Sequence, residues 1–151
     1  PFLALFKELA LLDSTIGLIL IYTLMVLPIV IWIMRDQFGG IPIELEEAAL
    51  VDGLSIWGAF FRIVFPLAAP GMVAAFILAL VLCWNEYFFA ALLTSTHATT
   101  IPVMVASQTG SQGINWWSMA ALSTAAIMPL VFIGIFLERY IIKGMTAGSV
   151  K

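Results

Sequence analysis

The sequence predicts an all-α protein, a polytopic bundle of transmembrane helices with three spans and a helix-turn-helix loop between the first two. Of its 151 residues, 63% are hydrophobic and 10% are charged, whereas soluble domains have about 45–50% apolar and about 25% charged residues. Three segments approach or exceed the roughly 20 apolar residues that cross a bilayer. Helices are expected because an open strand edge would leave unpaired backbone groups in hydrocarbon.

The predicted spans cover residues 16–34, 67–93 and 118–137. The first, IGLILIYTLMVLPIVIWIM, contains no charged residue. The second is interrupted only by Asn85 and Glu86. Because the chain opens on a proline rather than a methionine, we expect it to be a fragment or a processed product, with further spans before it.

Lysine and arginine are distributed unevenly among the segments outside the spans. Residues 94–117 contain none, whereas residues 35–66 and the C-terminal tail both contain them. The positive-inside rule therefore predicts that residues 35–66 and the C-terminus face the cytoplasm, and that residues 94–117 face the outside. The basic residues in question are Arg35, Arg62, Arg139, Lys143 and Lys151.

The loop of residues 35–66 has the signals of two short helices. Pro42 suits the start of a helix, where its missing N–H is not needed. Carboxylates in the next turns complement the helix dipole, and Gly53 is a natural stop. A second short helix is predicted over residues 55–64, with apolar residues on one face. The carboxylates are those of Glu44, Glu46 and Glu47.

The acidic start of this loop favours a protein partner over a lipid surface. Helices that lie on membranes favour lysine and arginine on the polar face. Acidic residues would be repelled by an anionic inner leaflet. We therefore expect the loop to contact another protein on the cytoplasmic side.

The segment EAALVDG (residues 47–53), followed by Ile63 and Pro66, resembles the EAA motif of binding-protein-dependent ABC importer permeases. The family pattern is Glu-Ala-Ala, three residues, Gly, nine residues and Ile-x-Leu-Pro; here Phe65 replaces the usual leucine. Asp52 and three further segments resemble the maltose-type branch, which takes up carbohydrates and polyols, and the chain resembles the C-terminal half of such permeases. These segments are DSTIGLIL (residues 13–20), residues 84–92 and KGMTAGSVK (residues 143–151).

The resemblance implies a site, a set of partners and a mechanism. In this family the loop is a coupling helix that docks on a dimer of ATP-binding subunits, whose closure rocks the permease from inward-open to outward-open. The other partners implied are a second, homologous permease subunit, a solute-binding protein outside the membrane and the bilayer. Residues 94–117 would contact the solute-binding protein, and the alternative is that they form a plain connector. The docking residues implied are Glu47, Ala48, Ala49, Asp52 and Gly53.

No enzymatic activity, cofactor or metal is expected of this chain. It has no G-x-x-x-x-G-K-[ST] phosphate loop, so the ATPase is expected on a separate subunit. His97 is the sole histidine and has no companion at metal-ligand spacing. A net charge of −3 with no basic cluster argues against nucleic acid.

Asn85 and Glu86 leave two interpretations open. A carboxylate at mid-bilayer costs about 2.5–3.5 kcal/mol, so such a group usually faces protein or an aqueous path. Both residues either line the solute pathway near its outer end or make helix–helix hydrogen bonds. The cargo expected is a carbohydrate or a sugar alcohol. The alternatives are another small solute within the same importer class and an ion-coupled secondary transporter, which would show inverted repeats.

Overall fold

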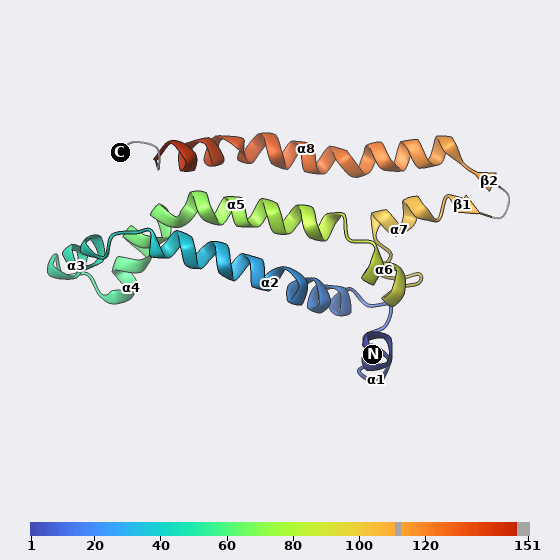
Figure 1. Cartoon of the computed structure of the whole chain (residues 1–151), viewed down its shortest axis with the longest axis horizontal. Coiled ribbons are helices and arrows are strands. Elements are labelled where there is room, and N and C mark those ends of the chain that lie inside the picture. Colours follow the sequence, from blue (N-terminus) through green and yellow to red (C-terminus); the bar gives the residue numbers. More distant parts are fainter. Residues whose placement is uncertain (111–112, 148–151) are drawn as a thin grey trace. The chain divides into compact units, whose positions relative to one another are not determined.

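Three long helices make up most of the protein, for which the computed structural model describes residues 1–110 and 113–147, with side chains as far as residue 140. They are α2 (Thr15–Gly39), α5 (Phe65–Trp84) and α8 (Trp116–Ala147) (Figure 1). Lys151 and the last residues of the KGMTAGSVK segment lie outside the described residues.

Short elements join the long helices. The two strands pair antiparallel, with Thr109 opposite Ile114. In chain order the short elements are α1 (Phe2–Glu8), α3 (Ile43–Val51), α4 (Ile56–Ala59), the π-helix η1 (Phe60–Val64), α6 (Phe88–Leu93), α7 (Ile101–Ala106), β1 (Thr109–Gly110) and β2 (Gly113–Ile114).

Three helical stretches are long and apolar enough to cross a membrane: Thr15–Gly39, Ile56–Trp84 and Trp116–Tyr140. This confirms the prediction of an all-α polytopic membrane protein. None of the residues in the apolar window of the third stretch is buried. That helix is therefore free, within the described chain, to face lipid or other helices.

The second span differs from its prediction at both ends. It was expected over residues 67–93, but α5 ends at Trp84 and the chain is not helical again until α6. The helix breaks because polar side chains at residues 85–86 hydrogen-bond the backbone on either side. At the other end, helix continues back through η1 to Ile56, so the span overlaps the predicted loop of residues 35–66.

The chain divides into two compact units, and each long helix contributes to both. The first unit comprises Pro1–Leu27 and Leu80–Ile133, and the second comprises Pro28–Ala79 and the chain from Gly134 onward.

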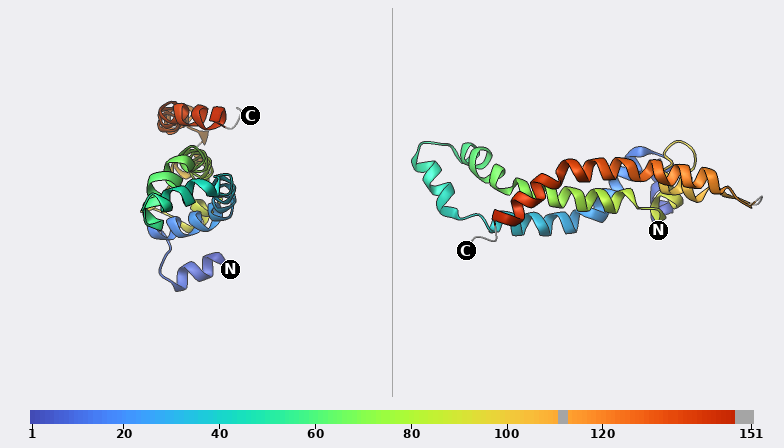
Figure 2. Two further views of the ribbon diagram at one scale, coloured as in Figure 1. Left: turned by 90° about the vertical axis from the view of Figure 1, so that its left-hand side faces the viewer. Right: turned by 90° about the horizontal axis from the view of Figure 1, so that it is seen from above.

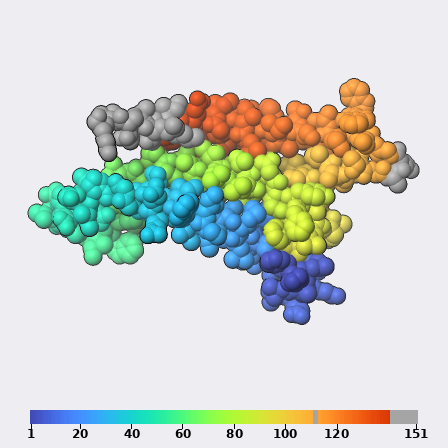
Figure 3. Space-filling view, viewed as in Figure 1, coloured from blue at the N-terminus to red at the C-terminus, as the bar shows by residue number. Residues whose placement is uncertain are grey.

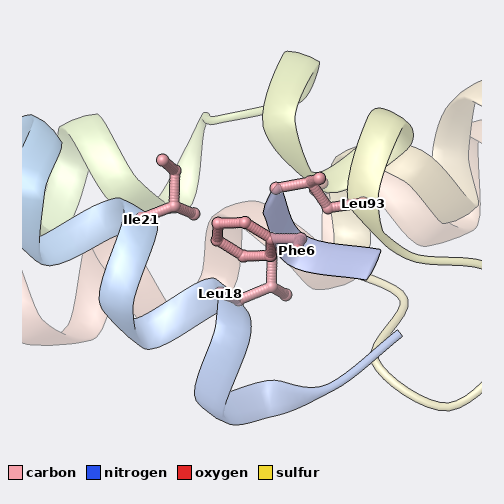
Figure 4. Packing of buried hydrophobic residues seen from close by; sticks show 5 residues of the cluster. Phe6, Leu18, Ile21 and Leu93 are labelled. Atoms are coloured by element: carbon pink, nitrogen blue, oxygen red, sulfur yellow. The ribbon is translucent and has the colours of Figure 1, made fainter. Parts of the chain in front are cut away.

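The first unit has a small apolar core in which α1 packs on α6, as the dark blue and yellow-green residues of Figure 3 show. Phe6 of α1 lies between side chains of α2 and α6 (Figure 4). Because burying a side chain of this size stabilises a fold by about 1.5–3 kcal/mol, the cluster fixes the N-terminal stretch against α6. Its buried members are Phe6, Leu18, Ile21, Ala90 and Leu93.

Gly17 is needed for the turn that leads into α2. A Cβ placed there would overlap the carbonyl oxygen of Leu11 and touch the Ser14 hydroxyl oxygen at 3.0 Å. Since a backbone carbonyl cannot swing aside, Gly17→Ala is expected to destabilise the protein by roughly 1–3 kcal/mol, the usual cost of overpacking. Unfolding of the purified protein in detergent measures this.

Gly134→Ala is the matched control, because Gly134 also lies in a long helix and a Cβ there would meet nothing within 4 Å. It is expected to be neutral or to stabilise by up to about 1 kcal/mol through helix propensity. Equal unfolding free energies for the two variants would contradict the proposed clash.

The second unit holds α2 and α5 together through small residues. Ala68, Gly71 and Ala75 of α5 are buried, and a Cβ on Gly71 would overlap the side chain of Gln37 from α2. Small residues allow such close approach between membrane helices. This packing sets where the chain leaves α2 and enters α5, and hence where α3 and α4 lie between them (Figure 2).

Candidate functional site

The candidate site in the second unit is a sharp elbow between α3 and α4. The chain reverses at Gly53, whose φ of +90° is in the left-handed region that favours glycine. The N–H of Gly53 donates to the Leu50 carbonyl at 3.0 Å, and the N–H of Leu54 donates to the Ala49 carbonyl at 3.1 Å. This pair of bonds is a Schellman motif, which satisfies the last carbonyls of α3.

The second arm of the elbow begins immediately afterwards. The Ser55 side chain accepts a hydrogen bond from the N–H of Gly58 at 3.1 Å and so caps α4. Ala49 and Ala59, one from each arm, are the buried residues of α3 and α4. The elbow is therefore locally complete: its helix ends are capped and its interior consists of alanines.

The structure divides the five predicted docking residues into two groups. Ala49 is 5% exposed and packs inside the elbow, so its contribution to docking would be indirect. The others are exposed, and within the described residues the Glu47 carboxylate makes no hydrogen bond and does not cap α3. The four exposed residues are Glu47, Ala48, Asp52 and Gly53.

Sequence reasoning missed the apolar residues around the turn. Val51 is 87% exposed and Ile56 is 76% exposed, one on each side of Gly53. The signal was visible in LVDGLSIW, where apolar pairs flank the turn residues. The elbow therefore exposes carboxylates and apolar side chains together.

An aromatic cluster joins the elbow to the helices beside it. Phe60 lies 5.1 Å from Phe61 and 6.2 Å from Phe38 of α2, measured between ring centroids. Trp57 stacks on Phe61 at 6.3 Å with an interplanar angle of 26°. Contacts of this geometry contribute about 0.5–1.5 kcal/mol each beyond their burial, so the elbow is held to the end of α2 and the start of α5.

The second candidate site, in the first unit, is the break between α5 and α6. Three consecutive side chains each bind a backbone group there. The Trp84 Nε1–H donates to the Ala126 carbonyl of α8 at 3.1 Å, and the Asn85 amide donates to the Val81 carbonyl at 2.8 Å. The Glu86 carboxylate accepts from the N–H groups that open α6.

The two bonds to Glu86 come from Phe89 at 2.8 Å and Ala90 at 3.1 Å. Backbone groups inside a membrane must be satisfied internally, and the Glu86 carboxylate supplies acceptors for two N–H groups at the start of α6. The Asn85 amide adds a second donor to the Val81 carbonyl, which also accepts from the Asn85 N–H. Glu86 therefore has a structural task in this arrangement.

A cavity of about 420 Å³ adjoins the break. Asn85 lines it together with Trp84, Tyr87 and mostly apolar residues of α7 and α8, such as Ile101 and Met119. Glu86 is not among the lining residues of this cavity, its carboxylate being used at the start of α6. The structure thus separates two residues that the sequence treated as a pair.

Asp13 forms a polar cluster that the sequence did not reveal. Its carboxylate accepts hydrogen bonds from the N–H and hydroxyl groups of Ser95, both at 2.9 Å, and from three following residues. These further donors are the N–H and hydroxyl of Thr96, the N–H of His97 and the N–H of Ala98, at 3.1 to 3.2 Å. The only signal in the sequence was a carboxylate at a span end and a run of hydroxyl residues, TSTHATT.

The same contacts keep Asp13 ionised. The backbone N–H of Ser95 above all, aided by those of His97 and Ala98, holds the pKa of the Asp13 carboxyl well below its usual range, although desolvation acts in the opposite direction. A carboxyl group with a depressed folded-state pKa stabilises the protein at neutral pH and loses that contribution only as the pH falls through the folded value. The Asp13 contacts are therefore expected to persist at mildly acidic pH.

An all-α chain with three membrane-length helices is a multi-pass membrane protein of the helical class. The chain belongs to the family described as binding-protein-dependent transport system inner membrane component, which it matches over residues 1–147. This is a family of transport proteins rather than enzymes, and the resemblance drawn from the EAA motif is confirmed.

Three relatives illustrate the similarity. The trehalose/maltose transport system permease protein MalG of Thermococcus litoralis is 37% identical over 132 residues, which cover 86% of this chain and 48% of that protein. The trehalose transport system permease protein SugB of Mycobacterium tuberculosis is 38% identical over 148 residues, which cover 96% of this chain and 54% of that protein. The diacetylchitobiose uptake system permease protein DasC of Streptomyces coelicolor is 32% identical over 146 residues, which cover 96% of this chain and 53% of that protein. The chain thus spans about half the length of these relatives.

Proposed function

We propose that this chain is part of a permease subunit of an ATP-driven importer in the inner, or plasma, membrane, where it forms part of the path for a carbohydrate or sugar alcohol. A solute-binding protein delivers the solute, a second permease subunit completes the path, and separate subunits hydrolyse ATP. The observation that carries the proposal is the α3–α4 elbow: a preformed, capped turn that bears the EAA motif between two membrane-length helices.

The elbow docks on the ATP-binding subunit through its exposed residues. Glu47 and Asp52 offer exposed carboxylates to a basic surface, Ala48 allows close approach, and Val51 enters an apolar pocket of the partner. Gly53 sets the angle between the arms, and Ala49 supports the turn from inside. An interface centred on apolar residues and rimmed by charge is typical of specific protein contacts.

The orientation follows from the charge distribution. Residues 35–66 and the C-terminus face the cytoplasm, where ATP is available, and residues 94–117 face the binding protein. The described part of the outer segment supports a contact surface, because α7 and the β1–β2 hairpin give it defined structure rather than that of a plain connector.

The solute passes near the α5–α6 break. Asn85 contacts it at the adjoining cavity, where its carbonyl oxygen is free to accept a hydrogen bond from a solute hydroxyl while its amide holds α5. Glu86 either contacts the solute as well or acts by holding α6 in place, and the second role is favoured by the two N–H groups that occupy its carboxylate.

The solute class rests on the relatives, whose names refer to trehalose, maltose and diacetylchitobiose. Sugars and sugar alcohols share closely spaced hydroxyl groups, and both are candidates for this chain. A different small solute within the same importer class remains the alternative, and uptake assays with labelled trehalose, maltose, sorbitol and mannitol separate these cases.

Copurification tests the proposal. The tagged permease, expressed with the proteins encoded beside it, is expected to bring down an ATPase, and in proteoliposomes solute uptake is expected to require ATP and a binding protein. Uptake that proceeds without any ATPase and follows an ion gradient would replace the proposal with a secondary transporter.

A further inference from the structure

We infer that Asp13 is a positioning residue: its carboxylate holds residues 95–98 in the conformation that the solute-binding protein meets. The inference rests on the proposed function, which places these residues on the outer side. It adds a residue that belongs neither to the EAA motif nor to the α5–α6 break, and assigns to it the presentation of the docking surface.

The Asp13 carboxylate makes several contacts, all of them with residues far away in the sequence. The Asp13 carboxylate gathers the N–H groups of four consecutive residues, 95–98, and two of their hydroxyls across more than 80 positions of sequence. Successive N–H groups turned toward one anion form a nest, which needs that anion to stay in shape. Within the described residues, these four N–H groups have no other acceptor.

Asp13 is itself held in place through its backbone. Its φ of +51° lies in the left-handed region, which a non-glycine residue enters only when its surroundings hold it there. Its N–H donates to the carbonyl of Leu93, a buried residue of the α1–α6 core, at 2.8 Å. The backbone of Asp13 therefore hydrogen-bonds the end of α6, while its side chain hydrogen-bonds the turn that follows.

Apart from the Asp13 carboxylate, the turn is supported chiefly at its end. The side chains of Ser95, Thr96 and His97 are exposed, whereas Ala98 packs against the apolar core and the Thr99 hydroxyl donates to the Ser95 carbonyl at 3.2 Å. The turn leads into α7, which lines the cavity beside the α5–α6 break. Loss of the carboxylate would thus loosen Ser95, Thr96 and His97, whereas Ala98 and Val103 of α7 would keep their contacts with the apolar core.

The chemistry requires a carboxylate at this position. The six donors share the two carboxylate oxygens, and the N–H groups of Thr96 and His97 each contact both of them. An asparagine amide offers one oxygen and turns an NH₂ group toward the remaining donors. A binding partner that meets a disordered turn must order it on docking, which weakens binding without changing the steps that follow. The effect of substitution should therefore fall on apparent affinity.

The test compares Asp13→Asn with Glu8→Gln in the complete transporter reconstituted in nanodiscs. Glu8 lies in α1 of the same unit, is exposed, and accepts no hydrogen bond within the described residues, so its neutralisation controls for the loss of one charge. Hydrogen exchange of amides 95–98 and the KM for the loaded binding protein, read from stimulated ATP hydrolysis, are measured for each.

For Asp13→Asn we expect exchange at these four amides to accelerate and the KM to rise, each by about 10-fold, with kcat unchanged, because one lost charge-assisted interaction is of that order. Glu8→Gln should match the native protein. If Asp13→Asn fails to assemble, Ser95→Ala, which removes one hydroxyl donor, should shift both quantities in the same direction by less.

Two results would overturn the inference. Unchanged exchange would show that Asp13 does not hold the turn, and faster exchange with an unchanged KM would show that the anchor has no part in docking. A native transporter that does not respond to any binding protein would instead overturn the proposed function, and the exchange measurement would still decide whether Asp13 anchors the turn.

Discussion

Replacing Gly53 with valine is expected to weaken docking of the ATPase by about 5- to 30-fold, which corresponds to one or two kcal/mol. The cause is the backbone alone. Gly53 has a φ of +90°, and a Cβ there would meet nothing within 4 Å. An L-residue in the left-handed region costs roughly 1–2 kcal/mol, and a β-branched residue fits it worst. Copurification of the ATPase and ATP-dependent uptake provide the measurement.

Two further variants separate backbone strain from added bulk. Gly39→Val adds the same side chain at the end of α2, where a Cβ also meets nothing within 4 Å and φ is not positive, so docking should be retained. Gly53→Asn should be milder than Gly53→Val because asparagine tolerates positive φ. If Gly53→Val docks and couples as the native protein does, the elbow does not depend on its turn and the proposed contact is wrong.

Removing the Glu86 side chain is the second change with a large expected effect. Glu86→Ala leaves the N–H groups of Phe89 and Ala90 at the start of α6 without their acceptor. Losing a helix cap costs about 0.5–2 kcal/mol, and the partial burial of these N–H groups favours the upper end of that range. We therefore expect a clear fall in the unfolding midpoint of the purified protein.

The conservative variant decides between the two roles of Glu86. Glu86→Gln keeps one acceptor oxygen, so a structural role predicts an intermediate loss of stability with the range of transported solutes unchanged. A role in the solute path predicts the reverse: native stability with altered uptake. Asn85→Ala serves as the comparison, because Asn85 lines the cavity, and its substitution should change uptake if the cavity belongs to the path.

The sequence predicted the elbow well because its signals are local. Pro42, the carboxylates of the first turn and Gly53 each act on the residues next to them, and the structure places a helix end at each. The helix beginning after Ser55 was also predicted, within one residue of its observed start. Local capping and turn preferences decide such boundaries before any tertiary contact forms.

The sequence failed where a side chain binds a distant part of the chain. Hydropathy alone carried the second span through Asn85 and Glu86, because it cannot register that the Glu86 carboxylate takes the place of helical acceptors for the N–H groups that open α6. The Asp13 cluster depends on partners more than 80 residues away. Neither a period nor a spacing in the sequence records such pairings.

The π-helical turn η1 determines the direction in which the residues before it face. One residue of an α-helix corresponds to about 100° of rotation, and a π-helical turn accommodates one residue more than an α-helical turn. If residues 60–64 tightened into ordinary α-helix with no change in length, Ile56 and Trp57 would swing by about that angle around the axis of α5. The elbow would then face a different direction. The π-helical turn therefore sets the rotation of the elbow about the axis of the membrane-spanning helix α5.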